Sequence, residues 1–154
     1  MSATIICIGK IKFLPYRHAC DEYLRRLKHY LPVKELELKA SSGSKWSDIE
    51  CKRRESEAIL QMIPTNAFFI CLDERGECPS SLDFAEFIRS KIDLGVPMFF
   101  AIGGALGHHE NLRRQAKYVL SLSHLTLPHE LARVVMLEQL YRAMSILKNE
   151  PYHK

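Results

Sequence analysis

The sequence predicts an α/β fold, with a mostly parallel sheet that is covered by helices. Short, continuously apolar runs at residues 67–72 and 96–102 are typical of strands buried on both faces, as in parallel sheets. Between such runs lie longer segments whose apolar residues recur at helical spacing, so strand and helix alternate along the chain. With 154 residues, of which 47% are hydrophobic, we expect a single domain over residues 1–154.

In the first half of the chain, local signals mark where the elements begin. Pro15 opens a helix, because its fixed φ suits the first helical turn. Ser47 and Glu50 fit a capping box, in which each side chain accepts a hydrogen bond from the backbone of the other. The elements expected here are a strand over 3–8, a helix from 15 that remains apolar to 31, a half-exposed strand over 33–39, a loop over 41–44 and a helix from 47 to about 62.

The second half contains three more predicted strands. Polar residues 73–76 mark the end of the first of them, and Gly103 and Gly104 interrupt the chain after the second. Ser80 can cap the helix between these two strands. The elements expected here are strands over 67–72, 96–102 and 118–122, and helices from 80 to about 91, near 110–117 and roughly over 130–147.

The strand ends indicate where a ligand would bind. In open α/β sheets, ligands lie beyond the carboxyl ends of the strands, so we expect the loops after Leu72, Ile102 and Leu122 to form the floor of a cofactor site. The small residues of segment 103–107 would let the backbone approach a ligand, although the segment matches neither a phosphate loop nor a dinucleotide-binding motif. A tight turn between strand and helix explains the same glycines equally well.

Residues 122–127 form the second unusual segment. Its three leucines alternate with polar residues directly before Pro128, where a helix is disfavoured. We therefore expect an extended, partly apolar loop that can lie against a flat aromatic ligand such as adenine. An ordinary edge strand would show the same pattern.

The last predicted helix, over 130–147, is apolar on more than one face. One arc carries the stripe that usually faces a core, while Val134 and Tyr141 lie on the other side, among polar residues such as Glu138 and Ser145. A second apolar face in so small a domain is most easily buried across a twofold axis, which predicts a homodimer. The alternative is a helix that is sandwiched inside one domain.

The chain ends with an unusual set of side chains. Tyr152, His153 and Lys154 offer a hydroxyl, an imidazole that titrates near neutral pH and a fixed cation, directly after the stiffening Pro151. This combination suits a site that handles an anionic or weakly acidic substrate. A solvated tail with chance polar residues is the alternative interpretation.

Composition limits the classes of function. The sequence contains no run of the ~18 to 20 apolar residues that a membrane span requires and no signal-like start, so we expect a cytoplasmic protein. Its five cysteines are odd in number and lack zinc-site spacing, which predicts reduced, mostly buried thiols and no metal site. The net charge of +4 permits RNA binding. The candidates for phosphate contacts are Arg25, Arg26, Lys28, Arg113, Arg114, Lys117, Lys148 and Lys154.

Motifs from both ends of the chain together resemble the RlmH family. They are Ile8-Gly9-Lys10, Tyr23-Leu24-Arg25-Arg26, Ile102-Gly103-Gly104, Ser121-Leu122-Ser123 with Leu125-Thr126-Leu127-Pro128-His129, Arg133-Val134-Val135, Glu138-Gln139-Leu140-Tyr141-Arg142-Ala143 and Tyr152-His153-Lys154. The resemblance implies a SPOUT-class methyltransferase that uses S-adenosylmethionine to methylate N3 of a pseudouridine in 23S ribosomal RNA. It also implies a C-terminal trefoil knot, which general rules of chain connection would not predict, and an obligate homodimer.

The same resemblance assigns roles to individual residues. The implied cofactor-binding residues are Leu72, Gly103, Leu122, Ser123, His124, Leu125, Thr126 and Leu127. For His124 we expect a contribution from the backbone and not from the ring. The implied catalytic residues are Tyr152 and His153, supplied by the partner subunit, and the neighbouring His129.

The chemistry of the implied reaction needs no metal or redox cofactor. Because the imide proton of the target base is weakly acidic, a positioned base should accelerate the transfer by roughly 10² to 10⁴-fold. His153 is the first candidate for that base, His129 is the second, and Tyr152 would position the target base or stack on it. The alternative for both histidines is RNA binding without proton transfer.

Two other functions remain open at this point. One is a non-catalytic ribosome- or RNA-binding factor with the same fold, which would not bind the cofactor. The other is a small module for a nucleotide or phosphate ligand, which the lack of a lysine-bearing glycine loop disfavours. If the chain is an enzyme, its small net charge is not enough to bind a long RNA sequence, so it must recognise the shape of its substrate. We therefore expect the assembled ribosome to be the substrate.

Overall fold

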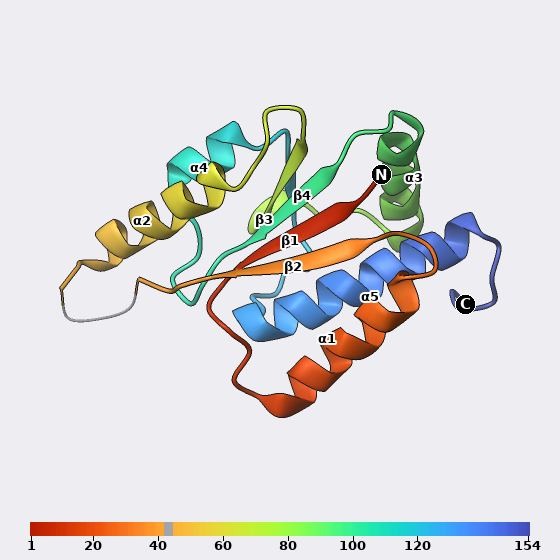
Figure 1. The fold of residues 1–154 in the computed structure, drawn as a ribbon, viewed down its shortest axis with the longest axis horizontal. Helices are drawn as coiled ribbons and strands as arrows, with labels where there is room; N and C mark the ends of the chain where they lie inside the picture. The colour runs from red at the N-terminus through yellow and green to blue at the C-terminus, as the bar shows by residue number, and fades with distance from the viewer. Residues whose placement is uncertain (42–44) are drawn as a thin grey trace.

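Five strands form one parallel sheet in the order β2-β1-β4-β3-β5 (Figure 1). The computed structural model describes residues 1–41 and 45–154. The strands are β1 (Ala3–Ile8), β2 (Val33–Leu38), β3 (Phe68–Glu77), β4 (Met98–Ile102) and β5 (Tyr118–Leu120). This sheet confirms the predicted α/β fold, whereas the trefoil knot remains a prediction.

Helices cover both faces of the sheet (Figure 1). They are α1 (Leu14–Leu27), α2 (Asp48–Gln61), α3 (Ser81–Asp93), α4 (Glu110–Gln115) and α5 (His129–Leu147). One apolar cluster joins α1, α3 and α5 to one face, and a second, smaller cluster joins α2 and α4 to the other. Within the described part of the chain, no helix combines the length and the apolar character that crossing a membrane requires.

The predicted serine caps are present at the starts of α2 and α3, but the described hydrogen bonds do not include the return bond of the capping box, from the Ser47 backbone to the Glu50 side chain. Ser47 Oγ accepts a hydrogen bond from the backbone N–H of Glu50 at 3.2 Å, and Ser80 Oγ accepts one from Asp83 at 3.1 Å. The carboxylate of Glu50 binds arginines one turn further along α2. Helix α1 ends at Leu27, earlier than its apolar pattern indicated. Residues 42–44 of the predicted loop lie outside the described residues.

Strand β3 extends beyond its predicted end. The polar residues 73–76 do not terminate the strand, which continues to Glu77. Its register against β5 shifts between Leu72 and Glu77, which both pair with Leu120, so the intervening residues form a bulge. A Cβ on Gly76 would come within 2.5 Å of a backbone oxygen of β5. The glycine therefore permits the close approach of two strands and does not mark a strand end.

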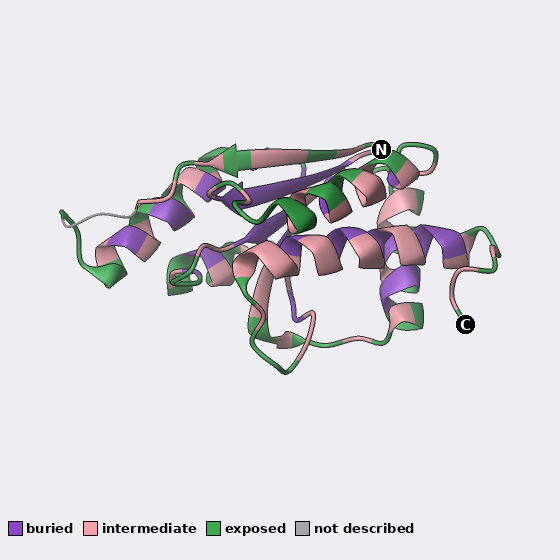
Figure 2. Cartoon of the chain, turned by 90° about the horizontal axis from the view of Figure 1, so that it is seen from below, coloured by how far each residue is buried: buried purple, intermediate pink, exposed green. Residues whose placement is uncertain are grey.

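Helix α5 packs between α1 and α3 and turns its fully buried residues toward the sheet (Figure 2). Val134 and Tyr141, from the second apolar face, are partly buried against the same core, so neighbouring helices of the chain cover part of that face. Ser145 was expected on the outer side, but it is fully buried. Its hydroxyl is satisfied because it donates to the carbonyl oxygen of Tyr141 at 3.0 Å. The homodimer remains a prediction.

An ion network fixes the first half of α5 to the sheet. Arg133 is only 1% exposed, and its guanidinium donates to Glu35 on β2 at 3.0 Å and to Glu37 at 2.7 Å. It also donates to the carbonyl oxygen of Gly9, directly after β1, at 3.2 Å. Arg17 of α1 completes the network through Glu35 at 2.6 Å. A buried guanidinium requires such partners, and these tie three elements together.

The cysteines agree with the prediction of mostly buried thiols. All five are free, and only Cys78 is exposed. Burial raises the pKa of Cys7 and of Cys71 to about 12, so both thiols remain protonated at neutral pH. They therefore pack as small apolar groups.

Candidate functional site

A cavity of about 630 Å³ lies at the carboxyl ends of β3, β4 and β5. This is the edge of the sheet where the sequence predicted a ligand, and the volume is within the range of small-molecule sites. The cofactor-binding candidates that line it are Leu72, Gly103, Leu122, Ser123, Leu125, Thr126 and Leu127. The catalytic candidate His129 lines it as well. The exposed His124 is not among its lining residues, although both of its neighbours are.

One wall of the cavity is a tight glycine turn after β4. The backbone N–H of Gly107 donates to the carbonyl oxygen of Gly104 at 3.0 Å, and Gly107 has a φ of 76°. A Cβ on Gly103 would come within 3.1 to 3.3 Å of the backbone of Gly107, so a side chain there would push the turn open. Segment 103–107 is therefore a turn and a cavity wall at once, and the two interpretations of its glycines do not compete.

The opposite wall is the loop over 122–127, which is irregular and bends at residues 122, 124 and 125, so the prediction of an extended segment was wrong. Two local hydrogen bonds, each between residues two positions apart, hold its shape. Ser121 Oγ donates to the carbonyl oxygen of Ser123 at 2.8 Å, and Ser123 Oγ accepts from the backbone of Leu125 at 2.9 Å. Thr126 Oγ1 donates to Glu74 of the β3 bulge at 2.6 Å, which links the loop to a neighbouring strand end. Leu125 is 78% exposed, an apolar side chain held at the rim without cover.

The β3 bulge brings charged groups to the cavity that the sequence reasoning missed. Asp73 lines it and pairs with Arg75 at 2.9 Å and with Arg113 of α4 at 3.5 Å. Burial alone would raise the pKa of Asp73, but the hydrogen bonds from Arg75 hold it below its usual range. The group is therefore ionised at neutral pH. The sequence does place Asp73 directly after an apolar strand, but this position by itself predicts only the end of that strand.

His108 is a second functional candidate that the sequence reasoning missed. It lines the cavity at the base of the glycine turn, is only 8% exposed, and its Nε2 lies 3.2 Å from the carbonyl oxygen of Ala101 on β4. Burial lowers the pKa of His108 to about 4, so the ring is neutral and donates from one nitrogen. It thereby ties the turn to the end of β4. Its neighbour His109 caps α4 by accepting a hydrogen bond from Asn111 at 3.2 Å.

The first turn of α5 closes the cavity. His129 is the first residue of the helix, and the carboxylate of Glu130 accepts hydrogen bonds from the backbones of Lys12 and Phe13 at 3.1 and 3.2 Å. These bonds lower the pKa of Glu130. Together with the Arg133 network, they fix the helix start relative to the loop that follows β1.

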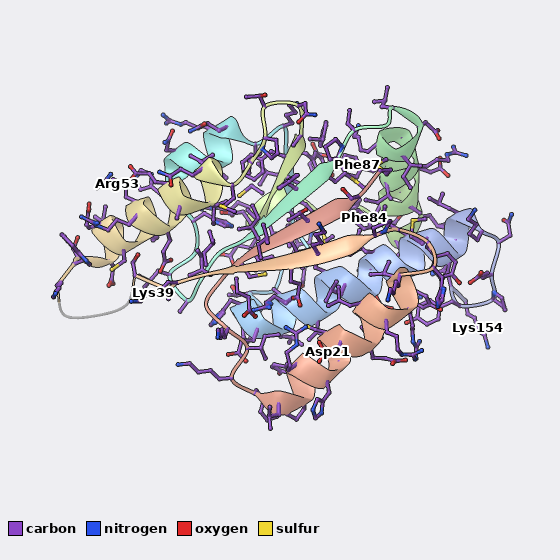
Figure 3. All side chains as sticks on the ribbon, viewed as in Figure 1. Asp21, Lys39, Arg53, Phe84, Phe87 and Lys154 are labelled. Carbon is purple, nitrogen blue, oxygen red and sulfur yellow. The ribbon has the colours of Figure 1, made fainter. Side chains whose placement is uncertain are left out.

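The two other catalytic candidates lie elsewhere. Tyr152 and His153 follow the last turn of α5, and Lys154, labelled in Figure 3, marks the end of the tail beyond that turn. The 19 residues of α5 span roughly 27 Å, so within one protomer the tail and the cavity are at opposite ends of the helix. The structure therefore brings His129 to the cavity but not Tyr152 or His153.

The tail is not a frayed terminus. Asn149 adopts a φ of 55°, a left-handed conformation that ends α5 and turns the chain back. Tyr30, in the turn after α1, donates to Glu150 at 2.6 Å, and the Tyr152 hydroxyl donates to Glu138 of α5 at 3.0 Å. The rings of Tyr141 and Tyr152 pack edge to face with centroids 4.7 Å apart. Side chains of α1 and α5 therefore fix the tail against its own protomer.

Many of the candidate phosphate-binding residues have other partners. Some form ion pairs with a glutamate of their own helix, namely Arg25, Arg26, Arg113 and Arg114. Lys117 Nζ donates to the carbonyl oxygen of Ala67 at 2.9 Å. Exposed lysines remain directly after α1 and after α5, namely Lys28, Lys148 and Lys154. Ion pairs on the surface are weak, so Arg25, Arg26 and Arg114 can still exchange a carboxylate for a phosphate, whereas Arg113 is largely buried.

Comparisons with known proteins cover the whole chain. A family model described as a predicted SPOUT methyltransferase matches residues 1–153. The chain is 41% identical to the ribosomal RNA large subunit methyltransferase H of Trichlorobacter lovleyi and 40% identical to that of Geobacter metallireducens, in each case over 99% of both chains. A solved structure of a probable methylase family protein from Haemophilus influenzae matches 99% of this chain and 70% of its own, with a TM-score of 0.56 at 12% identity. The last likeness supports the fold alone.

Proposed function

Because the chain belongs to the SPOUT methyltransferase family, we propose that it transfers a methyl group from S-adenosylmethionine to 23S ribosomal RNA. The family membership confirms what the sequence motifs indicated. One observation carries the assignment to this chain, namely that the strand-end cavity is lined by the segments that those motifs assign to the cofactor. The full-length relatives are named ribosomal RNA large subunit methyltransferases, which supports the choice of substrate.

The cavity suits S-adenosylmethionine in size and in chemistry. Its volume of about 630 Å³ accommodates a drug-sized molecule. The leucines of the 122–127 loop offer an apolar surface for adenine, and the glycine turn opposite leaves backbone groups accessible. The ionised Asp73 also lines the cavity, although Arg75 and Arg113 already pair with it. When bound there, S-adenosylmethionine supplies an electrophilic methyl group on a sulfonium.

We further propose that the acceptor is N3 of a pseudouridine. Transfer to an imide nitrogen converts a cationic donor into a neutral product, so alignment in a dry cavity supplies much of the acceleration. His129 lies at the cavity wall, at the start of α5, where it can contact the incoming base. The tail must supply the remaining groups, because the cavity of one protomer contains neither Tyr152 nor His153.

A homodimer would solve this separation. Two α5 helices that run antiparallel across a twofold axis would bring the tail of one protomer to the cavity of the other. Apolar side chains that such a contact would cover are exposed beside the cavity and at the nearby start of α1, namely Leu125, Phe13 and Leu14. The proposed site is therefore composite, and one subunit alone would be inactive.

Mixed dimers test this arrangement. One subunit carries Gly103→Val, which distorts the glycine turn and weakens cofactor binding, and the other carries His153→Ala, which removes the tail imidazole. Each variant alone should be strongly impaired at a low cofactor concentration, whereas the mixed dimer should regain activity because one of its two sites is intact. Inactivity of purified mixed dimers would contradict the composite site, and activity of a monomer in gel filtration with light scattering would contradict the dimer.

The modest net charge favours the assembled ribosome as the substrate over free RNA. The shape of the ribosome, and the proximity that it gives to the target base, would compensate for the weak RNA affinity of a protein with few unpaired cations. A protein that acts on ribosomes is expected in the cytoplasm. Modification of free RNA in preference to ribosomal particles, measured with radiolabelled S-adenosylmethionine, would contradict this proposal.

Mass spectrometry of ribosomal RNA tests the function itself. Digests of 23S RNA from wild-type cells should contain one methylated pseudouridine that is missing from cells lacking this protein. Addition of purified protein and S-adenosylmethionine to the deletion ribosomes should restore it. Calorimetry should detect cofactor binding. A protein that binds ribosomes but not S-adenosylmethionine would instead be a non-catalytic factor with this fold.

A further inference from the structure

The contact between Arg142 and His153 defines what the tail imidazole can do. Arg142 Nη1 lies 3.3 Å from His153 Nδ1. We propose that Arg142 holds His153 in the tautomer that carries its proton on Nε2, and that His153 donates a hydrogen bond to the target base and does not remove its proton. This inference rests on the proposed function and assigns a specific role within it.

The proton assignment follows from the chemistry of the two groups. A guanidinium has five N–H donors and no acceptor, so in this pair Nδ1 must be the acceptor. An unprotonated Nδ1 leaves the single proton of the neutral imidazole on Nε2. The lone pair that a general base would use is then occupied by Arg142, and the free edge of the ring presents an N–H donor.

The surroundings keep this contact in place. Arg142 also donates to Glu138 and stacks over the ring of Tyr152, with 4.7 Å between its carbon and the ring centroid. Tyr152 donates to Glu138 and lies 3.5 Å from the hydroxyl of Tyr23 on α1. Because Arg142 is held by a carboxylate and by a ring, its position does not depend on His153. Tyr152 is therefore a positioning residue that docks the tail and is not free to stack on RNA.

Methyl transfer to N3 requires that the ring first lose its N3 proton. The N3 proton of the uracil ring leaves to water, and the negative charge spreads over N3 and the ring carbonyl oxygens. His153 Nε2–H donates to one of these oxygens and stabilises the anion, as a donor in an oxyanion hole does. The N3 electron pair then forms the bond to the methyl carbon, while the electron pair of the breaking carbon–sulfur bond stays on sulfur.

The Gln and Ala variants of His153 separate a donor from a base. Glutamine offers an amide N–H at a position close to Nε2 but cannot accept a proton at neutral pH. His153→Ala should lower kcat by about 10² to 10³-fold, as loss of an oxyanion donor does. His153→Gln should recover most of this loss and show the same pH profile as the wild type.

The outcomes distinguish this inference from the function on which it rests. If His153→Gln is as slow as His153→Ala, the imidazole is needed for more than donation and the donor role is overturned. If His153→Ala is fully active, the tail is not part of the site, and the composite site fails together with the inference. If the wild type transfers no methyl group to deletion ribosomes, the proposed function fails.

NMR measures the tautomer without any turnover. In protein with ¹⁵N-labelled histidine, long-range ¹H–¹⁵N spectra distinguish a protonated from an unprotonated ring nitrogen, and the His153→Gln spectrum identifies the His153 signals by their absence. The wild type should show an unprotonated Nδ1 and a protonated Nε2, and Arg142→Met should shift the population toward the other tautomer. Arg26→Met is the matched control, because Arg26 stacks over Tyr23 and Tyr141 but forms no hydrogen bond with His153 in the described structure. A wild-type spectrum with the proton on Nδ1 would overturn the proposal.

Discussion

The two ends of α5 are built on different physical principles. At the start of the helix, the cavity is made from backbone and apolar surface, including a glycine turn and a leucine loop. At its end, the tail is held by tyrosine, arginine and glutamate side chains on half-buried surface. Backbone segments that the fold holds rigidly can bind a cofactor, because its shape is always the same. The groups that meet a substrate need polar side chains whose orientation neighbouring charges control.

The difference also concerns how each end is stabilised. The cavity end is anchored by long-range contacts to the sheet, through Arg133 and Glu130. The tail end is anchored to one neighbouring helix, α1, and to the last turns of α5 itself. Changes at the start of α5 should therefore affect stability and cofactor affinity. Changes at its end should affect turnover alone.

Removal of residues 151–154 should have the largest effect on activity. The variant loses Tyr152 and His153 but keeps the cavity residues and the Asn149 turn that ends α5. Methyl transfer should fall by about 10² to 10⁴-fold, because positioned polar groups contribute on this scale. The affinity for S-adenosylmethionine, measured by calorimetry, should be unchanged. Loss of cofactor binding on truncation would show that the two ends are not independent.

Arg133→Met should have the largest effect on stability. It removes the buried partner of Glu35 and Glu37, although Glu35 keeps Arg17 at 2.6 Å, and breaking a buried ion pair costs up to about 3–5 kcal/mol. Urea unfolding should show a lower midpoint at unchanged slope. Arg25→Met is the matched control, because the pair of Arg25 with Glu22 is exposed and surface pairs contribute little to stability. Equal effects of the two substitutions would refute the anchoring role.

A graded series at Gly103 should affect the cavity and spare the tail. A Cβ there meets the backbone of Gly107 at 3.1 to 3.3 Å, so Gly103→Ala needs a small shift of the turn and Gly103→Val a larger one. We expect the cofactor affinity to fall by about tenfold for alanine and about a hundredfold for valine, since each factor of ten corresponds to about 1.4 kcal/mol. The NMR signals of His153 should not change. If they shift, the glycine turn and the tail are coupled.

The parts of the fold that depend on local signals could be predicted from the sequence. The apolar runs of β3 and β4 identified the parallel sheet, and the hydroxyls of Ser47 and Ser80 located two helix starts. The rule that ligands bind at strand ends then located the cavity before any family resemblance was used. These features could be predicted because each depends on residues that are close in sequence or on a general property of sheets.

The missed features depend on contacts between distant parts of the chain. The residues 73–76 form a bulge because β5 pairs on both sides of them, which no local pattern shows. Arg133 is buried because carboxylates of β2 lie beneath it, although an arginine on a helix is usually solvated. The tail docks through Tyr30, in the turn after α1, and Glu138 on α5, which are distant in sequence.

The pH dependence of stability also separates the two ends of α5. Burial lowers the pKa of His108 to about 4 in the folded state, whereas about 6.5 is expected in the unfolded chain. Between these values only the unfolded chain binds the proton, so stability falls as the pH drops below about 6.5 and continues to fall until about 4. His108 should thus cost the folded state about 2 kcal/mol between pH 7 and pH 5, since one pKa unit corresponds to about 1.36 kcal/mol. His108→Gln should lose this part of the pH dependence in urea unfolding, whereas the exposed His18→Gln should keep it. An unchanged pH dependence in His108→Gln would mean that water already reaches the His108 ring at the base of the glycine turn. The cavity end of α5 would then be less rigid than its contacts indicate.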